Sequence, residues 1–196
     1  LMADKSHYNQ GDSARITVKG TSNVHAWSAT TTAVRVVRAA IGEAEGDAIA
    51  SLQQPDGLKA FDVAIAAVSL KSDKDGLDKN MYKALKAEQY PDITVRLDRI
   101  TLAATGSAGD TLAVQAEGTL TIAGQSRPAI LPGKLYPGGG GLWLDGQYRL
   151  KMSEFGIKPP ALMMGTIKVG DPVTIKYHLQ FTNREAVGVN ATSGGL

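Results

Sequence analysis

The sequence predicts an all-β domain of antiparallel strands with a single α-helix. Eight segments are predicted as strands, and most of them alternate apolar and polar residues, which is the period of a strand with one buried and one solvated face. Only one segment shows helical spacing, whereas a parallel α/β sheet needs helices between most of its strands. The 196 residues are 43% hydrophobic and 20% charged, so the chain has enough apolar material to build a core.

The first half of the chain contains four predicted strands. Residues 13–20 alternate apolar and polar side chains, and residues 24–37 are rich in Thr and Val, which favour strands. Two shorter alternating segments follow, around residues 60–65 and 93–98. The apolar faces of the first, third and fourth strands are formed by Ile16 and Val18, by Phe61, Val63 and Ile65, and by Ile93, Val95 and Leu97.

The segment between the third and fourth strands predicts the helix. Residues 76–90 place three apolar side chains four positions apart, which makes one face of an amphipathic helix. Asp75 is the expected N-cap, and Pro91 marks the end. The apolar face consists of Leu77, Met81 and Leu85.

The second half of the chain contains the other four strands. Residues 111–122, "TLAVQAEGTLTI", alternate most clearly, and residues 127–136 follow them. Four glycines at 138–141 precede a strand at 142–150, and the last strand covers 173–181. The predicted inward faces contain Leu112, Val114, Ala116, Gly118, Leu120 and Ile122, then Leu142, Leu144, Gly146, Tyr148 and Leu150, then Val173, Ile175, Tyr177, Leu179 and Phe181.

Eight two-faced strands are compatible with a sandwich or a closed barrel. An eight-stranded barrel is just wide enough to be filled by side chains or to hold one ligand. A barrel that faces lipid carries girdles of Trp and Tyr, whereas this chain is only 6% aromatic. No apolar run reaches the roughly 18 residues of a membrane helix. We therefore expect a protein that does not span a membrane.

The sequence contains no catalytic or cofactor motif. It has no Cys, which excludes thiol chemistry. His7, His25 and His178 are far apart, and His178 falls on a polar face, which favours a surface role over metal ligation. The glycines at 138–141 lack the Lys-Ser/Thr pair of a phosphate-binding loop. We expect no metal, no cofactor and no catalysis.

The charge pattern bears on macromolecular partners. The formal net charge is +2, and the basic residues are scattered along the chain. Nucleic-acid binding needs a concentrated basic face, so nucleic acid is not an expected partner. The sequence leaves the oligomeric state open, and a homodimer is one option.

Small and flexible residues near the inward faces have two interpretations each. Ala116, Gly118 and Gly146 either relieve crowding and permit bends, or leave room in a barrel lumen for a ligand. The pattern leaves both interpretations open. For Met163 and Met164, in a loop between strands, packing at the core or rim is the simpler interpretation, and a flexible lip on a lipid pocket is the alternative.

Four stretches together resemble the YceI-like family, the lipocalin-like polyisoprenoid-binding proteins of bacteria. They are "GTSNVHAW", "VSLKSDKDGLDKNMYKALKAEQYPDITV", "GTLTIAGQSRP" and "FGIKPPALMMGTIKVGDPVTI", in order along the chain. The resemblance implies an eight-stranded antiparallel lipocalin-like barrel with one covering helix, and an exported protein, periplasmic or secreted. The expected domain covers residues 13–182, with an N-terminal extension at 1–12 and a C-terminal tail at 183–196.

The resemblance also implies a ligand, either a polyprenyl lipid or a quinone tail, held in the lumen without catalysis. Transport or sequestration of that lipid is the expected function. The alternatives are an enzyme acting on a small apolar substrate inside the barrel, and a filled barrel that acts as a stress or interaction module. The expected ligand-binding residues are Trp27, Phe61, Val63, Ile65, Ile93, Val95, Leu112, Val114, Ala116, Gly118, Leu120, Leu142, Leu144, Gly146, Tyr148, Leu150, Met163, Ile175, Tyr177, Leu179 and Phe181.

Gly146 carries a specific expectation. Its missing side chain is expected to leave space beside the barrel axis, between Leu144 and Tyr148. Gly146→Trp would then fill the lumen, leaving the fold mostly intact and reducing ligand binding.

Overall fold

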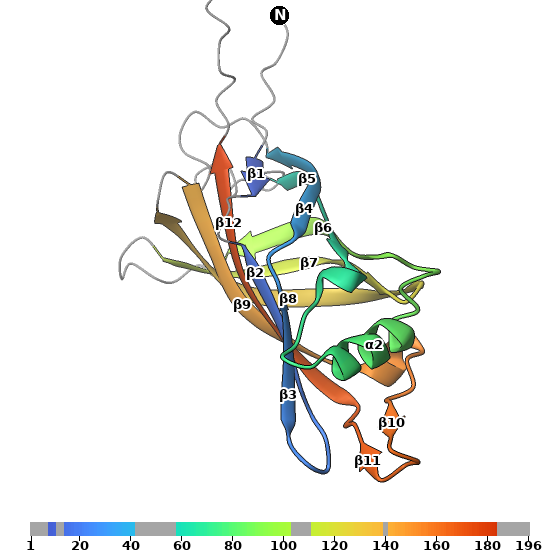
Figure 1. Cartoon of the computed structure of the whole chain (residues 1–196). Coiled ribbons are helices and arrows are strands. Elements are labelled where there is room, and N and C mark those ends of the chain that lie inside the picture. The colour runs from blue at the N-terminus through green and yellow to red at the C-terminus, as the bar shows by residue number, and fades with distance from the viewer. Residues whose placement is uncertain (1–7, 11–13, 42–57, 103–110, 139–140, 184–196) are drawn as a thin grey trace, which may run out of the picture.

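A computed structural model describes residues 8–10, 14–41, 58–102, 111–138 and 141–183, and it is mostly β-structure (Figure 1). Nine antiparallel strands form one curled, half-barrel sheet in the order β3-β2-β12-β9-β8-β7-β6-β5-β4. Their bounds are β2 Arg15–Thr21, β3 Ala26–Thr31, β4 Val34–Ile41, β5 Leu58–Ala66, β6 Asp92–Leu102, β7 Leu112–Ile122, β8 Gln125–Gly138, β9 Gly141–Lys151 and β12 Pro172–Asn183.

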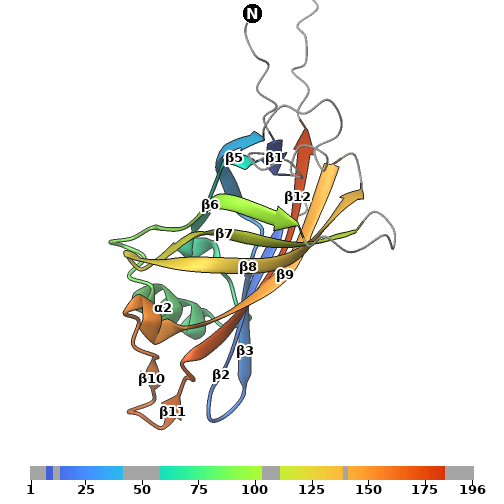
Figure 2. The same cartoon turned by 180° about the vertical axis from the view of Figure 1, so that it is seen from behind.

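Short elements complete the described structure. Strand β1 pairs with the end of β12 beside β2, and β10 pairs with β11 in a separate small hairpin. Seen from behind, β6, β7 and β8 cross the molecule, and β2 and β3 run down beside them (Figure 2). The bounds are β1 Tyr8–Gln10, η1 Ala67–Ser69, α2 Asp75–Ala84, η2 Met152–Phe155, β10 Ala161–Leu162 and β11 Ile167–Lys168.

The all-β, antiparallel, one-helix prediction is confirmed, and the closed eight-stranded barrel is corrected. The segment predicted as one strand at 24–37 breaks into β3, which pairs with β2, and β4, which pairs with β5. The Thr31 hydroxyl accepts the Ala33 N–H at 3.0 Å, a local bond that competes with the strand ladder. The two ends of the sheet are thus consecutive in the chain, but within the described residues no ladder joins them.

Helix α2 is shorter than predicted. The helix was expected to cover residues 76–90 with Asp75 as its N-cap. It begins at Asp75, so the N-cap is Lys74, and it ends at Ala84. Lys86 has a φ of +52°, in the left-handed region, and this conformation cannot continue a right-handed helix. Turns therefore replace the helix before Pro91.

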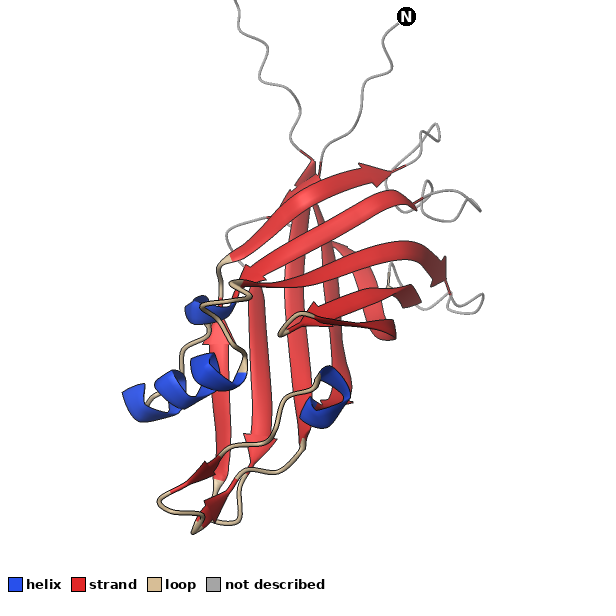
Figure 3. Cartoon of the chain, turned by 90° about the vertical axis from the view of Figure 1, so that its right-hand side faces the viewer, coloured by secondary structure: helices blue, strands red, loops and turns tan. Residues whose placement is uncertain are grey.

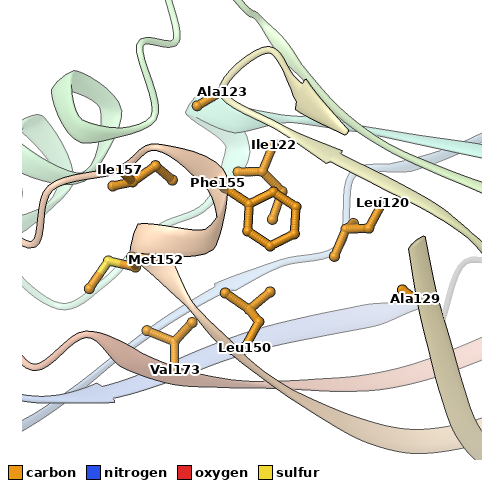
Figure 4. Close-up of a cluster of buried hydrophobic side chains, with 9 residues drawn as sticks. All are labelled: Leu120, Ile122, Ala123, Ala129, Leu150, Met152, Phe155, Ile157 and Val173. Carbon is orange, nitrogen blue, oxygen red and sulfur yellow. The ribbon is translucent and has the colours of Figure 1, made fainter. Parts of the chain in front are cut away.

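Two groups of buried side chains flank the interior. One lies where β2, β4, β5 and β12 meet, and the other is centred on Phe155 of η2 (Figure 4). Figure 4 shows Phe155, Leu150 and Leu120 converging from η2, β9 and β7. No large side chain in the described part of the chain is completely buried. A tightly filled interior of close-packed side chains would contain such residues.

Candidate ligand cavity

An apolar cavity of about 630 Å³ occupies the concave side of the sheet. Its walls come from the strands, from α2 and from the β10–β11 hairpin, which Figure 3 shows at one end of the sheet. Along β12 the cavity touches every second residue from Val173 to Leu179, a span of about 20 Å at 3.3 Å per residue. The cavity is therefore long enough for an extended apolar chain.

Helix α2 closes part of this cavity with the predicted face. Leu77, Met81 and Leu85 all line it, as does Ala84. The helix is fixed to the preceding loop by two hydrogen bonds: the Ser72 N–H donates to the Asp78 carboxylate at 2.8 Å, and the Tyr82 hydroxyl donates to the Leu70 carbonyl at 2.6 Å.

Most of the residues expected to bind a ligand lie in the cavity wall. This placement shows which side chains a ligand could touch, while their role in binding stays a prediction. The residues from the predicted set that line the cavity are Trp27, Phe61, Val63, Ile65, Ile93, Val95, Ala116, Leu120, Leu144, Tyr148, Leu150, Met163, Ile175, Tyr177 and Leu179.

Four other predicted residues do not line it, namely Leu112, Val114, Gly118 and Gly146. Val114 is buried and lies 3.5 Å from where a Cβ on Gly133 would be, as Leu144 of the wall does at 2.8 Å, so it packs on the concave face without lining the cavity. The side chains of Leu142 and Phe181 lie outside the described part of the structure.

The inward glycines have a structural explanation. A Cβ on Gly118 would lie 2.0 Å from the Arg96 carbonyl oxygen, beside the irregularity in the β6–β7 register. A Cβ on Gly146 would lie 2.3 Å from both the Pro132 carbonyl oxygen and the Tyr177 ring. These glycines permit close approach of neighbouring groups, so the expectation that Gly146 leaves empty lumen is wrong.

Tyr177 occupies the space above Gly146. The two residues face each other across β12 and β9, and the Tyr177 hydroxyl donates a hydrogen bond to the Pro132 carbonyl on β8. Burial raises the pKa of Tyr177 to about 12. The phenol therefore stays neutral at physiological pH and offers the cavity its ring.

Several wall residues were missed as ligand contacts. Ile16 and Val18 alternate on β2 and could have been included from that pattern. Leu162 and Ile167 belong to two-residue strands, too short to show any periodicity. Leu131 lies on β8, where the three prolines of the strand obscure the alternation.

Polar residues gather at one end of the cavity. Ser22, His25, Lys74 and Asn80 line it there, between the β2–β3 turn and the start of α2, and its described lining contains no Asp or Glu. Trp27 also lines the wall, and its buried Nε1–H has no hydrogen-bond partner in the described structure. This end can therefore hydrogen-bond a polar group.

A second, polar groove of about 790 Å³ adjoins this end. It shares His25, Trp27, Lys74 and Leu77 with the apolar cavity. Four cationic side chains line the groove against a single carboxylate, that of Asp73. The cationic residues are Lys19, Lys71, Lys74 and Arg149.

The other described histidine, His178, lies on the outer face of the sheet, as its polar-face position predicted. Its Nδ1 pairs with the Asp145 carboxylate, and its ring stacks on Trp143 with centroids 4.4 Å apart. Burial alone would raise the pKa of Asp145, but hydrogen bonds from Tyr136 and His178 hold it below its usual range. The described residues contain no group of three metal-ligating side chains, and the expectation of no metal stays a prediction.

The YceI-like domain family matches residues 12–181, nearly the whole described chain. The chain belongs to the YceI-like family. Among solved structures, this YceI-like chain is similar to BcnA of Burkholderia cenocepacia, at 18% identity and a TM-score of 0.61, over 85% of this chain and 95% of that one.

Two further structures resemble this YceI-like chain. A polyisoprenoid binding domain from Saccharophagus degradans matches at 11% identity and a TM-score of 0.68, over 91% of this chain and 99% of that one. A Campylobacter jejuni YceI protein matches at 18% identity and a TM-score of 0.51, over 78% of this chain and 85% of that one. At these identities the likeness shows the fold. No curated protein matches the chain, and no helix in the described residues is long and apolar enough to cross a membrane.

Proposed function

We propose that this protein binds one isoprenoid lipid, either a polyprenyl chain or a quinone tail, and carries or sequesters it without catalysis. The observation that supports this most directly is the cavity of about 630 Å³ with an almost entirely apolar wall. Its volume lies within the range of ligand-binding sites in proteins. Membership of the YceI-like family and the fold shared with a polyisoprenoid binding domain support the same ligand class.

The physical drive for binding is the transfer of a long hydrocarbon chain out of water. Each buried CH₂ group contributes about 0.8 kcal/mol, and ordering the chain offsets part of the sum. The polar end of the cavity suits the head group, because Ser22, His25, Lys74 and Asn80 line it and the adjoining groove carries Lys19, Lys71 and Arg149. An exported location, periplasmic or secreted, belongs to the same proposal and rests on the resemblance to the family.

The open cavity also bears on the two alternatives. A filled barrel acting through protein contacts would not leave such a volume inside the sheet. Acid–base catalysis would need a paired acid and base at the substrate, and the titratable side chains of the described wall, His25, Lys74, Tyr148 and Tyr177, form no hydrogen bond with one another. A non-catalytic lipid-binding role therefore fits the described wall best.

The direct test is organic extraction of the purified protein followed by lipid mass spectrometry. We expect about one isoprenoid-containing lipid per chain. A preparation from a lipid-producing host that yields no such lipid, and that fails to take up a prenyl lipid added in vitro, would contradict the proposal.

A matched pair of variants on β7 tests the site. Ala116 faces the cavity and Ala113, three residues earlier, faces outward and is exposed. Ala116→Phe puts a ring into the cavity, so we expect a folded protein with at least a severalfold loss of bound lipid. Ala113→Phe should retain the lipid, and equal lipid content in both variants would argue against binding in this cavity.

A further inference from the structure

The β2–β3 turn and the β10–β11 hairpin lie side by side at one end of the molecule (Figure 1), where Ser22 and Val169 form an isolated β-bridge. The side chain of Asn23 in the β2–β3 turn donates to the Thr166 carbonyl at 2.9 Å and accepts from the Lys168 N–H at 2.8 Å. Its backbone N–H donates to the Lys168 carbonyl at 3.0 Å. The turn at residues 22–25 and the β10–β11 hairpin thus form one continuous rim, here called the lip.

The lip exposes large apolar side chains at its outermost positions. Met164 is fully exposed, Met163 is 74% exposed and Val24 is 62% exposed. Met163 also lines the cavity, and Leu162 and Ile167 continue the apolar surface inward from it. On the side of the hairpin, apolar side chains therefore connect the surface of the lip with the cavity, while the polar residues lie on the side of the β2–β3 turn and α2.

The backbone of the lip makes these methionines unusual. Met163 and Met164 have φ angles of +49° and +58°, in a turn closed by the Gly165 N–H bonding to the Leu162 carbonyl at 3.1 Å. Asn and Gly adopt this conformation at lower cost, and they are also better solvated in an exposed turn. A residue choice that opposes both local backbone preference and solvation is expected at functional sites.

The lip itself carries cationic side chains. Lys168 of the hairpin is exposed, Lys158 precedes the hairpin and is also exposed, and His25 lies in the turn. The nearest carboxylates along the chain, Glu154 and Asp171, lie outside the hairpin, beyond the two ends of the segment 156–170. Lys74, at the start of α2, adds a further cation to the cavity mouth.

We propose that the lip is a docking surface for a lipid bilayer containing anionic lipids. Met163, Met164 and Val24 enter the boundary between head groups and acyl chains, and Lys158 and Lys168 contact the anionic head groups. The apolar path from Met163 into the cavity then opens directly onto the membrane. Docking is independent of what the cavity holds, so it can be tested separately from the proposed lipid binding.

A bilayer fits this surface better than a protein partner does. The exposed apolar residues belong to two hairpin tips (Figures 1 and 2), whereas a stable protein interface needs a broad surface of about 800 Å² per partner. Aliphatic groups beside lysines are the combination that binds peripheral proteins to anionic membranes.

The test is flotation of the purified full chain with vesicles of phosphatidylcholine alone or of phosphatidylcholine mixed with phosphatidylglycerol. We expect stronger binding to the mixed vesicles, weakened by salt. The double variant Val24→Ser, Met164→Asn avoids every cavity-lining residue, and Asn suits the positive φ at 164. We expect its vesicle partition coefficient to fall roughly tenfold, because binding scales with buried apolar area, and its lipid content to stay unchanged.

Two control pairs accompany this variant. Val37→Ser, Ile130→Ser removes two exposed apolar side chains, 63% and 56% exposed, from β4 and β8, and this variant should bind vesicles like the wild type. For the double variant Lys158→Gln, Lys168→Gln, the vesicle partition coefficient should fall roughly fivefold per lysine, and only on the mixed vesicles. The control double variant Lys134→Gln, Lys176→Gln changes two lysines on the outer face of the sheet. Its partition coefficient on the mixed vesicles should fall less than that of Lys158→Gln, Lys168→Gln.

The outcomes separate docking from the proposed function. Wild-type protein that carries lipid but floats with neither vesicle type would overturn docking alone, and floating protein that carries no isoprenoid would overturn only the proposed function. A lip variant that floats as well as the wild type, or control pairs that lose as much as the lip variants, would also overturn docking. So would a wild-type dimer that ignores vesicles and dissociates in the lip variant, since the lip would then contact a second copy.

Discussion

Aromatic side chains line this cavity by lying across glycines on the neighbouring strand. Trp27 of β3 covers its direct partner Gly20 on β2, where a Cβ would lie 2.3 Å from the indole ring. Tyr177 covers Gly146 in the same way. Such pairs let a large ring lie flat on the sheet, so the ring becomes part of the wall and leaves the middle of the cavity open.

Gly146→Ala is therefore expected to destabilise the protein. The added methyl group would overlap the Pro132 carbonyl oxygen and the Tyr177 ring, each 2.3 Å away, and the backbone oxygen cannot rotate aside. Overpacking of this kind costs typically about 1–3 kcal/mol. Chemical denaturation of the wild type and the variant measures the difference in the free energy of unfolding.

Gly76→Ala is the matched control. Gly76 lies in the first turn of α2, and a Cβ there would meet nothing within 4 Å. Because Ala favours the helix and restricts the unfolded chain, this variant should gain up to about 1 kcal/mol. A Gly146→Ala protein as stable as Gly76→Ala would show that the sheet can shift to admit the methyl group.

The role of the small residues could not be predicted from the sequence alone. An inward glycine has the same place in the alternation whether it faces empty space or a covering ring. What decides is the cross-strand register, which brings Tyr177 opposite Gly146. Ala116, by contrast, does face the cavity, as one of the two interpretations expected.

At the scale of elements, Asp78 connects α2 to the loop before it. Asp78 is only 4% exposed, yet it accepts the Ser72 N–H at 2.8 Å and lies 3.8 Å from the Lys71 ammonium group. Burial alone would raise the pKa of Asp78, but hydrogen bonds from Ser72 and the charge of Lys71 outweigh it and hold the pKa below its usual range.

This lowered pKa predicts how stability depends on pH. The ionised carboxylate of Asp78 stabilises the fold above its unfolded pKa of about 3.9, and that contribution is lost as the pH falls through the lower folded pKa. Asp78→Asn should be less stable at pH 7 by roughly 1–3 kcal/mol, because its amide replaces a charge-assisted acceptor. It should lose less stability than the wild type on acidification.

Thermal melts from pH 7 down to about pH 2 measure this difference. Asp75→Asn makes the same change of charge at an exposed position in the same helix and controls for net charge. Parallel curves of melting temperature against pH for the wild type and Asp78→Asn would show that Asp78 is not the group responsible.

The elements themselves were predictable where burial imposes a period. Alternation located the long strands, and spacing of four located α2, because each has one face on the interior. The break between β3 and β4 was not predictable. Thr is common inside strands, and its hydroxyl can also accept a local backbone hydrogen bond that ends a strand, as Thr31 does here. Residues 8–10 of the expected N-terminal extension form β1, and residues 184–196 of the expected tail lie outside the described structure.

At the scale of the whole molecule, the sequence could not predict whether the sheet closes into a barrel. The strand count left a sandwich or a closed barrel open, and the family resemblance implied the barrel. The path of hydrogen bonds instead has two ends, β3 and β4, that belong to one bent segment. The volume enclosed by the curled sheet depends on register and bulges, which no local pattern encodes. A cavity rather than a filled core is therefore a conclusion from the structure.

An open apolar cavity makes stability depend on its contents. A lipid that binds only the folded state stabilises it by RT ln(1 + [L]/Kd), about 2.7 kcal/mol at a hundredfold excess over Kd. For a chain of this size that corresponds to a rise in melting temperature of roughly 5–10 °C. Protein stripped of lipid on a hydrophobic resin should therefore melt that much lower while its far-ultraviolet circular dichroism stays the same.

Adding back a prenyl lipid should restore the melting temperature, and Ala116→Phe, with its cavity blocked, should respond to neither treatment. The comparison separates a lipid that fills the cavity from one bound loosely outside it. Only a lipid inside the cavity should raise the melting temperature of the wild type and fail to raise that of Ala116→Phe. Stripped and lipid-loaded proteins with the same melting temperature would mean that the lipid does not occupy the cavity.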